Sequence, residues 1–388
     1  MTSTLRIGSL RRGEDADRVT NVELFFDLVY VFAVTQLAHV LVTHPTVEGA
    51  VQAAVLLAMV WQVWVYTTWA INYLDPGRYA VRLMLLVLMG ASLVLAAELP
   101  EAFHDRGLLV AGMFAGMQIA RCVFAIWALR GEQLQVVFVR ILPWSMTSGA
   151  VAIAGAFVHG WARAALWAAA VAIDLSGAAF GFYVPGIGRS TTTDWTISGS
   201  HFAERCQAFV LIALGESVVV TGAHLAAVPA PSGEDMAVFA VAFAGTVALW
   251  WVYFDRSAED SAERIATSSD PGRLARSAFH WVHPVIVAGI IVAAAADETV
   301  LEHPAEHADA VTAWLVLGGT GLYLAGHALF KWVMWRVVSW PRLIAVLVLL
   351  ALVPLAEHVA RLALASIALA VVVGVAIADR LMHPAATS

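Results

Sequence analysis

The chain has 388 residues, of which 61% are hydrophobic and only 13% are charged. A soluble domain is typically about half apolar and about a quarter charged, so this composition excludes an ordinary soluble enzyme and a disordered chain. The formal net charge of -7 leaves no basic surface for phosphates and excludes a nucleic-acid binder. The two cysteines, Cys122 and Cys206, cannot form a disulfide framework or a zinc site by themselves. The composition therefore predicts an integral membrane protein.

Twelve apolar runs follow a polar N-terminal segment, and each is close to the length of about 20 residues that a helix needs to cross the hydrocarbon core. The runs are continuous and rich in Ala, Leu and Val, whereas the strands of a membrane barrel alternate in polarity. We therefore expect an all-α polytopic integral membrane protein with about 12 transmembrane helices. The spans are expected near 22–43, 50–73, 80–98, 107–129, 137–158, 162–184, 202–224, 235–254, 277–296, 309–331, 342–358 and 361–380.

The basic residues predict how these spans are oriented. If the N-terminus is inside, 17 of the 22 basic residues fall in cytoplasmic segments and 3 in external ones, while Arg121 and Arg205 fall within spans. Residues 1–18 contain no short apolar stretch with a small-residue cleavage site, so we expect no removable signal peptide. Both termini are therefore expected in the cytoplasm.

The twelve spans divide into two halves that share short motifs in the same order. Trp-Val-Tyr occurs at 64–66 and 251–253, Asp-Pro-Gly-Arg follows at 75–78 and 270–273, and Gly90 and Arg163 match Gly289 and Arg361. Six spans is an even number, so both halves enter from the same side, which predicts two parallel six-helix repeats related by an axis along the membrane normal. The expected organisation is a cytoplasmic segment 1–21, a first repeat 22–184, a cytoplasmic linker 185–201, a second repeat 202–380 and a cytoplasmic tail 381–388.

The repeated Asp-Pro-Gly-Arg motif has two interpretations. Asp caps a helix N-terminus, Pro suits the first helical turn, and Arg suits the cytoplasmic face, so the motif is typical of a helix start on that side. The alternative is a gating or docking role at this face.

Ionisable residues within spans are the candidate site residues, because a charge at the bilayer centre costs about 2.5–3.5 kcal/mol on insertion scales. Glu23 and Asp27 are four residues apart and therefore share a helix face. Two carboxylates on one face can share a proton, because charging both in a low dielectric is costly. The alternative for Glu23 is an ion pair with Arg18 or another cytoplasmic arginine.

The seventh span has the densest group of charges. His201, Glu204 and Arg205 lie in its first turn, and Glu216 lies beyond its midpoint. Arg205 and Glu216 differ by only about 20° around the helix but are about 16 Å apart along it, so each needs a partner from another span or water. This group is expected to act either as a buried polar network that fixes helix register or as a permeation path or proton relay.

Two further charges lie at mid-depth in the first half. Arg121 is in the middle of the fourth span and Asp174 in the middle of the sixth, and an ion pair of Arg121 with Asp174 or Glu216 is the simplest way to satisfy both charges. The position aligned with Arg121 in the second half is His327, which can change its charge near neutral pH. The sequence contains no recognisable metal-binding, nucleotide-binding or hydrolase motif, so we expect no metal and no cofactor.

Two long motifs resemble a known family. The segments ELFFDLVYVFAVTQLAH at 23–39 and HFAERCQAFVLIALGES at 201–217 are similar to the bacterial low temperature requirement protein A (LtrA) family, and the similarity extends from about Val22 to the last span. The resemblance implies a multi-pass protein of the bacterial cell (inner) membrane, with a name drawn from growth in the cold. It implies no established biochemical activity.

Three classes of function agree with these features. Two parallel halves, polar groups at mid-depth and the lack of a catalytic domain favour a transporter or channel that moves protons, ions or a small solute. The first alternative is an intramembrane enzyme acting on lipid or isoprenoid substrates, with His201, Glu204 and Arg205 as its acid–base and phosphate-binding group. The second is a membrane stress-response factor without turnover. We favour the transporter or channel over an enzyme, with the lipid bilayer and a small solute or ion as partners, no nucleic acid, and no prediction of oligomeric state.

Overall fold

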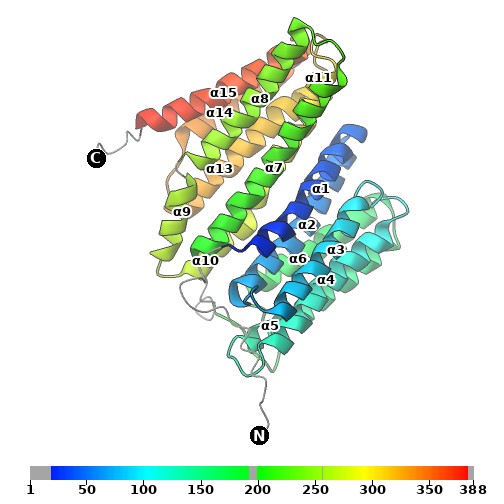
Figure 1. The fold of residues 1–388 in the computed structure, drawn as a ribbon, viewed down its shortest axis with the longest axis vertical. Helices are drawn as coiled ribbons and strands as arrows, with labels where there is room; N and C mark the ends of the chain where they lie inside the picture. Colours follow the sequence, from blue (N-terminus) through cyan, green and yellow to red (C-terminus); the bar gives the residue numbers. More distant parts are fainter. Residues whose placement is uncertain (1–18, 192–198, 256, 383–388) are drawn as a thin grey trace. The chain divides into compact units, whose positions relative to one another are not determined.

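The structure is a computed structural model that describes residues 19–191, 199–255 and 257–382 (Figure 1). The described residues are almost entirely helical, and none of them forms a β-strand. Short π-helical segments cover Arg276–Val282 and Trp314–Gly318, and a 3-10 segment covers Val353–His358. The α-helices are α1 Asn21–Thr43, α2 Val47–Tyr73, α3 Tyr79–Ala97, α4 Gly107–Ala128, α5 Gln135–Ala156, α6 Gly160–Ala179, α7 Gly199–Ala227, α8 Gly233–Phe254, α9 Ser257–Ala266, α10 Pro271–Ala275, α11 His283–Glu302, α12 Ala310–Ala313, α13 Gly319–Trp335, α14 Trp340–Leu352 and α15 Arg361–Met382.

Twelve helical stretches of the described chain are long and apolar enough to cross a membrane. The all-α class and the number of spans are thus confirmed. The ends of the spans differ from the prediction by a few residues. The seventh span begins at Gly199, which places His201 in α7, and the ninth begins at Pro271, because a π-helical segment joins α10 to α11. Much of the expected N-terminal segment, linker and tail, namely residues 1–18, 192–198 and 383–388, lies outside the described residues.

The two Asp-Pro-Gly-Arg motifs form different local structures. Asp270 caps α10, because its Oδ1 accepts a hydrogen bond from the backbone N–H of Arg273 at 3.0 Å and the proline of the motif is the first helical residue. Asp75 instead closes a turn, and α3 begins only at Tyr79. In both motifs Asp and Arg form an exposed ion pair, at 3.6 Å for Asp75–Arg78 and 3.4 Å for Asp270–Arg273. The second motif therefore contains the predicted helix start, whereas in the first motif the helix begins only after the last residue of the motif.

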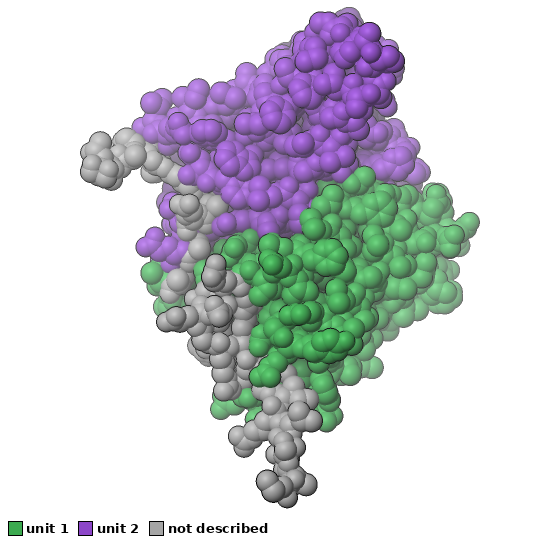
Figure 2. Space-filling model, in the orientation of Figure 1, with its two compact units in different colours: residues 1–36, 51–205, 265–275 green, residues 37–50, 206–264, 276–388 purple. Residues whose placement is uncertain are grey.

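The chain folds into two compact units, coloured green and purple in Figure 2. Unit 1 comprises Met1–Gln36, Val51–Arg205 and Ile265–Ala275, and unit 2 comprises Leu37–Ala50, Cys206–Arg264 and Arg276–Ser388. The division passes through α1 and α7, so each unit contains a part of both helices. The parallel relation of the two halves remains a prediction.

Helix α2 of unit 1 is the most buried of the candidate spans. In its most apolar window 89% of the residues are buried, and Val63, Trp64 and Val65 have no exposed surface. Helices α3, α4, α5 and α6 pack in sequence order, each on the next. A helix that is apolar and buried on all sides can present polar side chains in several directions without contact with lipid.

Unit 2 is built around the packing of α11 on α13, with α8, α14 and α15 completing the bundle. Glycine permits the close approach of these two helices. A Cβ at Gly289 of α11 would meet backbone atoms of Tyr323 in α13, and a Cβ at Gly326 of α13 would meet Ile286 of α11. Small residues at helix contacts are typical of packing inside membranes, where backbone approach and van der Waals contact hold helices together.

The matched arginines 163 and 361 have similar roles within their own units. Arg163, at the start of α6, donates hydrogen bonds to the carbonyl oxygens of Ala102 and His104 at 2.7 and 2.9 Å, after the end of α3. Arg361, at the start of α15, donates to the carbonyl of Thr299 in the last turn of α11 at 3.1 Å. Each arginine therefore supplies donors to carbonyl groups near the end of the third span of its half, where the helix itself supplies none.

Candidate functional site

Helix α1 places its acidic side chains inward and its apolar side chains outward. Glu23 and Asp27 have no exposed surface, and Tyr30 on the same face is also buried. On the opposite face Phe25 and Leu28 are 52% and 56% exposed. This inverted pattern suits a helix that faces lipid on one side and a polar interior on the other. The predicted shared face of Glu23 and Asp27 is thus the buried face of α1.

Arg205 of α7 is paired with both carboxylates. Its Nε donates to Oδ2 of Asp27 at 2.7 Å and its Nη2 to Oδ1 of Asp27 at 2.5 Å, which makes a bidentate fork. Its Nη1 lies 3.3 Å from Oε1 of Glu23. All three side chains are fully buried. A bidentate pair of this kind combines charge and fixed geometry and is among the strongest hydrogen-bonded contacts in proteins.

His201 links the same cluster to α2. Its Nε2 lies 2.7 Å from Oε1 of Glu23, and its Nδ1 lies 3.2 Å from Nδ2 of Asn72. With its proton on Nε2, the neutral ring donates to the carboxylate, and its Nδ1 accepts from the amide of Asn72. The other oxygen of Glu23 accepts hydrogen bonds from the backbone N–H and the hydroxyl of Thr20 at 2.8 and 2.7 Å. Thr20 directly precedes α1, so these bonds also close the start of that helix.

Trp64 of α2 completes the cluster. Its indole N–H donates to Oδ1 of Asp27 at 2.7 Å, and its ring lies 5.9 Å from the guanidinium carbon of Arg205. The ring therefore serves Asp27 as a hydrogen-bond donor and Arg205 as an aromatic face. We call Glu23, Asp27, His201 and Arg205 the charge cluster.

The composition of the charge cluster allows it to hold one exchangeable proton. Two carboxylates and one guanidinium leave a charge of -1 when His201 is neutral, and these four side chains become neutral when His201 is protonated. The charge cluster therefore contains a titratable histidine in hydrogen-bond contact with a buried carboxylate.

A second polar network lies in unit 1 on α2, α4, α5 and α6. Arg121 donates to Oγ1 of Thr67 at 3.3 Å and bonds the side-chain oxygen of Gln118. The amide nitrogen of Gln118 donates to Oδ2 of Asp174 at 3.1 Å, and the hydroxyl of Ser148 donates to the same oxygen at 3.0 Å. The expected direct ion pair of Arg121 with Asp174 is thus replaced by a bridge through Gln118, which is one turn before Arg121 on α4 and can bond both.

Glu204 and Glu216 lie apart from the charge cluster. Glu204 directly precedes Arg205, but it is exposed, because neighbouring residues of a helix point about 100° apart. Glu216 is buried within unit 2, about three turns further along α7 than Arg205. Arg18, the alternative partner for Glu23, lies outside the described residues.

His327 lies in a different environment from Arg121, with which it was aligned. It is buried in unit 2 against two aromatic rings, with centroid distances of 5.4 Å to Tyr253 and 4.7 Å to Tyr323. Neither ring nitrogen of His327 has a hydrogen-bond partner among the described residues. Across residues 19–191, 199–255 and 257–382, no group of three or more His, Cys, Asp and Glu side chains is placed to hold a metal ion.

Several neutral residues of these networks were not predicted as site residues. In the sequence, Trp64 stands out only as part of a repeated tripeptide, and the neutral residues Thr20, Asn72, Gln118 and Ser148 carry no charge that would mark them as site residues. The spacing of three between Gln118 and Arg121 could have indicated a bridge, because residues three apart share a helix face. The spacing of Thr20 and Glu23 is likewise that of a capping box at a helix start. For Asn72 the sequence carries no comparable signal, since His201 lies 129 residues away and only the fold brings the two together.

Comparisons with known proteins show the family of the chain. The sequence profile of the family described as "Bacterial low temperature requirement A protein (LtrA)" matches residues 18–377, which include every member of the charge cluster. An uncharacterized protein of Rhizobium meliloti (strain 1021) is 35% identical over 367 residues, which cover 93% of this chain and 90% of that protein. No solved structure matches the chain.

Proposed function

The chain belongs to the bacterial low temperature requirement A (LtrA) family, and on this premise we propose that it is a transporter or channel that moves protons, alone or with a small ion or solute. The observation that carries the proposal is the charge cluster: four ionisable side chains with no exposed surface, joined by hydrogen bonds of 2.5–3.3 Å.

The position of the cluster gives the reason. Buried charges within membrane spans are costly, and they are typical of proton relays and ion pathways. Arg205 contacts two carboxylates that lie one turn apart on α1. Glu23 also contacts His201, and Asp27, one turn further along α1, also contacts Trp64. A proton that arrives at His201 weakens the hold of Arg205 on Glu23, because the two cations then share that carboxylate. The second network, from Arg121 to Asp174, would supply further polar groups from Thr67 onward, about one turn along α2 from Trp64.

The enzyme alternative receives less support. It requires His201, Glu204 and Arg205 to face one substrate, but Glu204 is exposed, whereas His201 and Arg205 are fully buried and engaged with carboxylates. An engaged guanidinium offers few donors to a phosphate group. No specific observation favours a stress-response role without turnover.

The proposed location is the bacterial inner membrane with both termini in the cytoplasm, and the partners are the bilayer and a small solute or ion. The support is the bias of 17 basic residues to 3 between the two sides. A reporter fused at His104 should read as external, and one fused at Gly131 as cytoplasmic. The opposite pair of signals would invert the proposed topology.

Proton movement is tested with purified protein in liposomes that contain a pH-sensitive dye, under an imposed pH gradient. Glu23→Gln keeps the shape of the side chain but removes its charge, so it should abolish flux. Glu204→Gln makes the same chemical change on the exposed side of the neighbouring helix and should retain flux. Unfolding temperatures of both variants show whether loss of flux is loss of fold. Equal flux from a folded Glu23→Gln variant and the wild type would contradict the proposal.

A further inference from the structure

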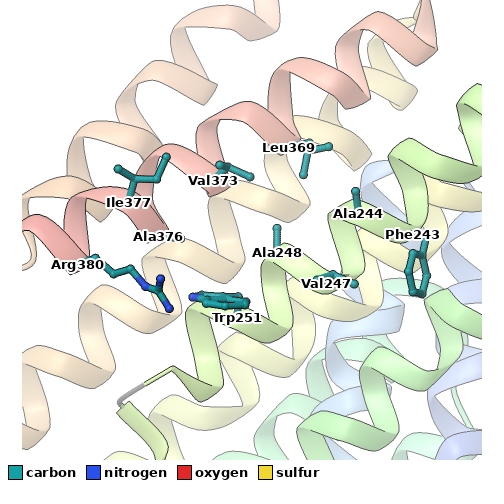
Figure 3. Close-up of a pocket in the computed structure, with 10 residues that line it drawn as sticks. All are labelled: Phe243, Ala244, Val247, Ala248, Trp251, Leu369, Val373, Ala376, Ile377 and Arg380. Atoms are coloured by element: carbon teal, nitrogen blue, oxygen red, sulfur yellow. The ribbon is translucent and has the colours of Figure 1, made fainter. Parts of the chain in front are cut away.

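An open groove runs between α8 and α15 in unit 2 (Figure 3). Its volume is about 550 Å³, and its walls are apolar except at one end. The larger side chains along it are Phe243, Val247 and Trp251 from α8 and Val373 and Ile377 from α15, and small alanines form its floor. A groove with these walls accepts a flexible apolar chain.

The groove opens to the outside of unit 2. Phe243, Val373 and Ile377, which border it, are 45%, 40% and 54% exposed. Both flanking helices are candidate membrane spans, so this exposed surface lies at the depth of the lipid acyl chains. The occupant available at that depth is hydrocarbon.

One end of the groove is charged. Arg380, in the last turn of α15, lies with its guanidinium carbon 4.7 Å from the ring of Trp251, near the end of α8. Its Nη2 lies 3.4 Å from Oδ1 of Asp255, and its side chain is 58% exposed. One long bond leaves most of the five guanidinium donors without a protein partner among the described residues. Tryptophan at the end of a span is typical of the headgroup level, where phosphate groups lie.

The carboxylate next to Arg380 is engaged by other cations. Asp379 is paired with Arg342 at 2.7 Å and with Lys331 at 3.7 Å. Among the described residues, Arg380 therefore keeps only its long contact with Asp255. An exposed guanidinium that is held this loosely at the headgroup level favours an anionic headgroup.

We propose that this groove binds an anionic glycerophospholipid, with one acyl chain between α8 and α15 and its phosphate on Arg380. The lipid chain covers the apolar walls, and the phosphate takes the free donors of the guanidinium in the geometry that arginine offers to phosphate. This site is independent of the charge cluster in unit 1 and of the proposed proton movement.

The test uses the full-length protein in detergent, with lipid binding followed by native mass spectrometry and by thermal unfolding. Dioleoyl phosphatidylglycerol should be retained and should raise the unfolding temperature more than dioleoyl phosphatidylcholine does. Arg380→Gln should weaken retention of phosphatidylglycerol by about tenfold, as expected for loss of a charge-assisted contact. The matched control is Arg336→Gln, because Arg336 is also exposed and lies 4.9 Å from a tryptophan ring, that of Trp332, but does not border the groove.

A second pair of variants tests the acyl-chain part of the site. Val373→Trp should fill the groove and reduce retention, whereas Leu347→Trp, at an exposed position of α14, should not. Equal retention of the two lipids, or unchanged retention in Val373→Trp, would overturn the proposal. Inorganic phosphate alone giving the full stabilisation would reduce the site to an anion site and overturn it. If the protein formed dimers and Val373→Trp disrupted the dimer without changing lipid retention, the groove would be a contact between two copies of the chain and the lipid proposal would be overturned.

Discussion

The tripeptide Trp-Val-Tyr occurs once in each unit, and its two copies have different surroundings. In unit 1 Trp64 donates to Asp27 in the charge cluster, and the ring of Tyr66 lies 5.3 Å from the guanidinium carbon of Arg121. In unit 2 the corresponding Trp251 borders the open groove, and Tyr253 packs against His327.

The comparison shows how one local motif supports two kinds of interior. In unit 1 the motif lies among carboxylates and guanidinium groups, whose burial requires matched charges and hydrogen bonds. In unit 2 the tyrosine of the motif lies among rings, where His283 and His327 contact Tyr253. Around the motif, unit 1 therefore offers titratable groups in hydrogen-bond contact, whereas unit 2 offers mainly aromatic packing. Unit 2 has buried charges elsewhere, such as Arg342, which pairs with Asp379 at 2.7 Å. The proposed proton movement rests on the charge cluster of unit 1.

The largest effect is expected from breaking the fork in unit 1. Asp27→Leu should leave the buried guanidinium of Arg205 without its bidentate partner and lower the free energy of unfolding by about 3–5 kcal/mol. Denaturant or thermal unfolding in detergent measures the change. The double variant Asp27→Leu with Arg205→Leu should recover part of the loss, because it removes the orphaned charge as well.

The control for this experiment is Glu204→Leu, at the exposed position next to Arg205, which should change stability by less than about 0.5 kcal/mol. Equal stability of Asp27→Leu and the wild type would show that the fork is not a source of stability in unit 1.

A smaller difference in stability is expected between alanine substitutions at two glycines that occupy matched positions of the two halves. Gly289→Ala should cost about 1–3 kcal/mol, because the new methyl group would meet the backbone of Tyr323. Gly90→Ala should be neutral or stabilise by up to about 1 kcal/mol, since nothing lies within 4 Å of a Cβ there and alanine favours the helix. The same unfolding measurement compares them, and a cost at Gly90 as large as that at Gly289 would contradict the packing described for α11 and α13.

The smallest effect is expected at the aromatic interior of unit 2. His327→Leu should change stability by less than about 1.5 kcal/mol, because leucine fills similar space and the ring nitrogens of His327 have no hydrogen-bond partner among the described residues. Arg121→Leu at the aligned position should cost more, since it breaks the bonds to Thr67 and Gln118. A loss at His327 that exceeds the loss at Arg121 would remove the contrast between the two interiors.

Much of the fold could be predicted from the sequence because the length and apolarity of a membrane span are local properties. The ends were less predictable. The ninth span begins at Pro271 and not near 277, because the π-helical segment Arg276–Val282 joins α10 to α11. Arg273 and Arg276 lower the apolar signal over the added residues. The early start of α7 has a similar cause, since polar residues precede Phe202 although the helix begins at Gly199.

The site was predictable only in part. A spacing of four identified the shared face of Glu23 and Asp27, and the need for a partner followed from the cost of a buried charge. The identity of that partner, Arg205, did not follow, because 178 residues separate it from Asp27 and only the fold joins them. The bridge between Arg121 and Asp174 was not predictable from the ionisable residues alone, because Gln118, which forms it, is neutral.

The most direct test of the account compares two buried histidines in the same flux assay. His201→Gln removes the titratable group of the charge cluster in unit 1, and His327→Gln removes a buried histidine of the aromatic interior in unit 2. In liposomes with an imposed pH gradient, folded His201→Gln should lose proton flux and folded His327→Gln should retain it. Wild-type flux from His201→Gln, or equal loss from His327→Gln, would contradict the assignment of proton movement to the charge cluster.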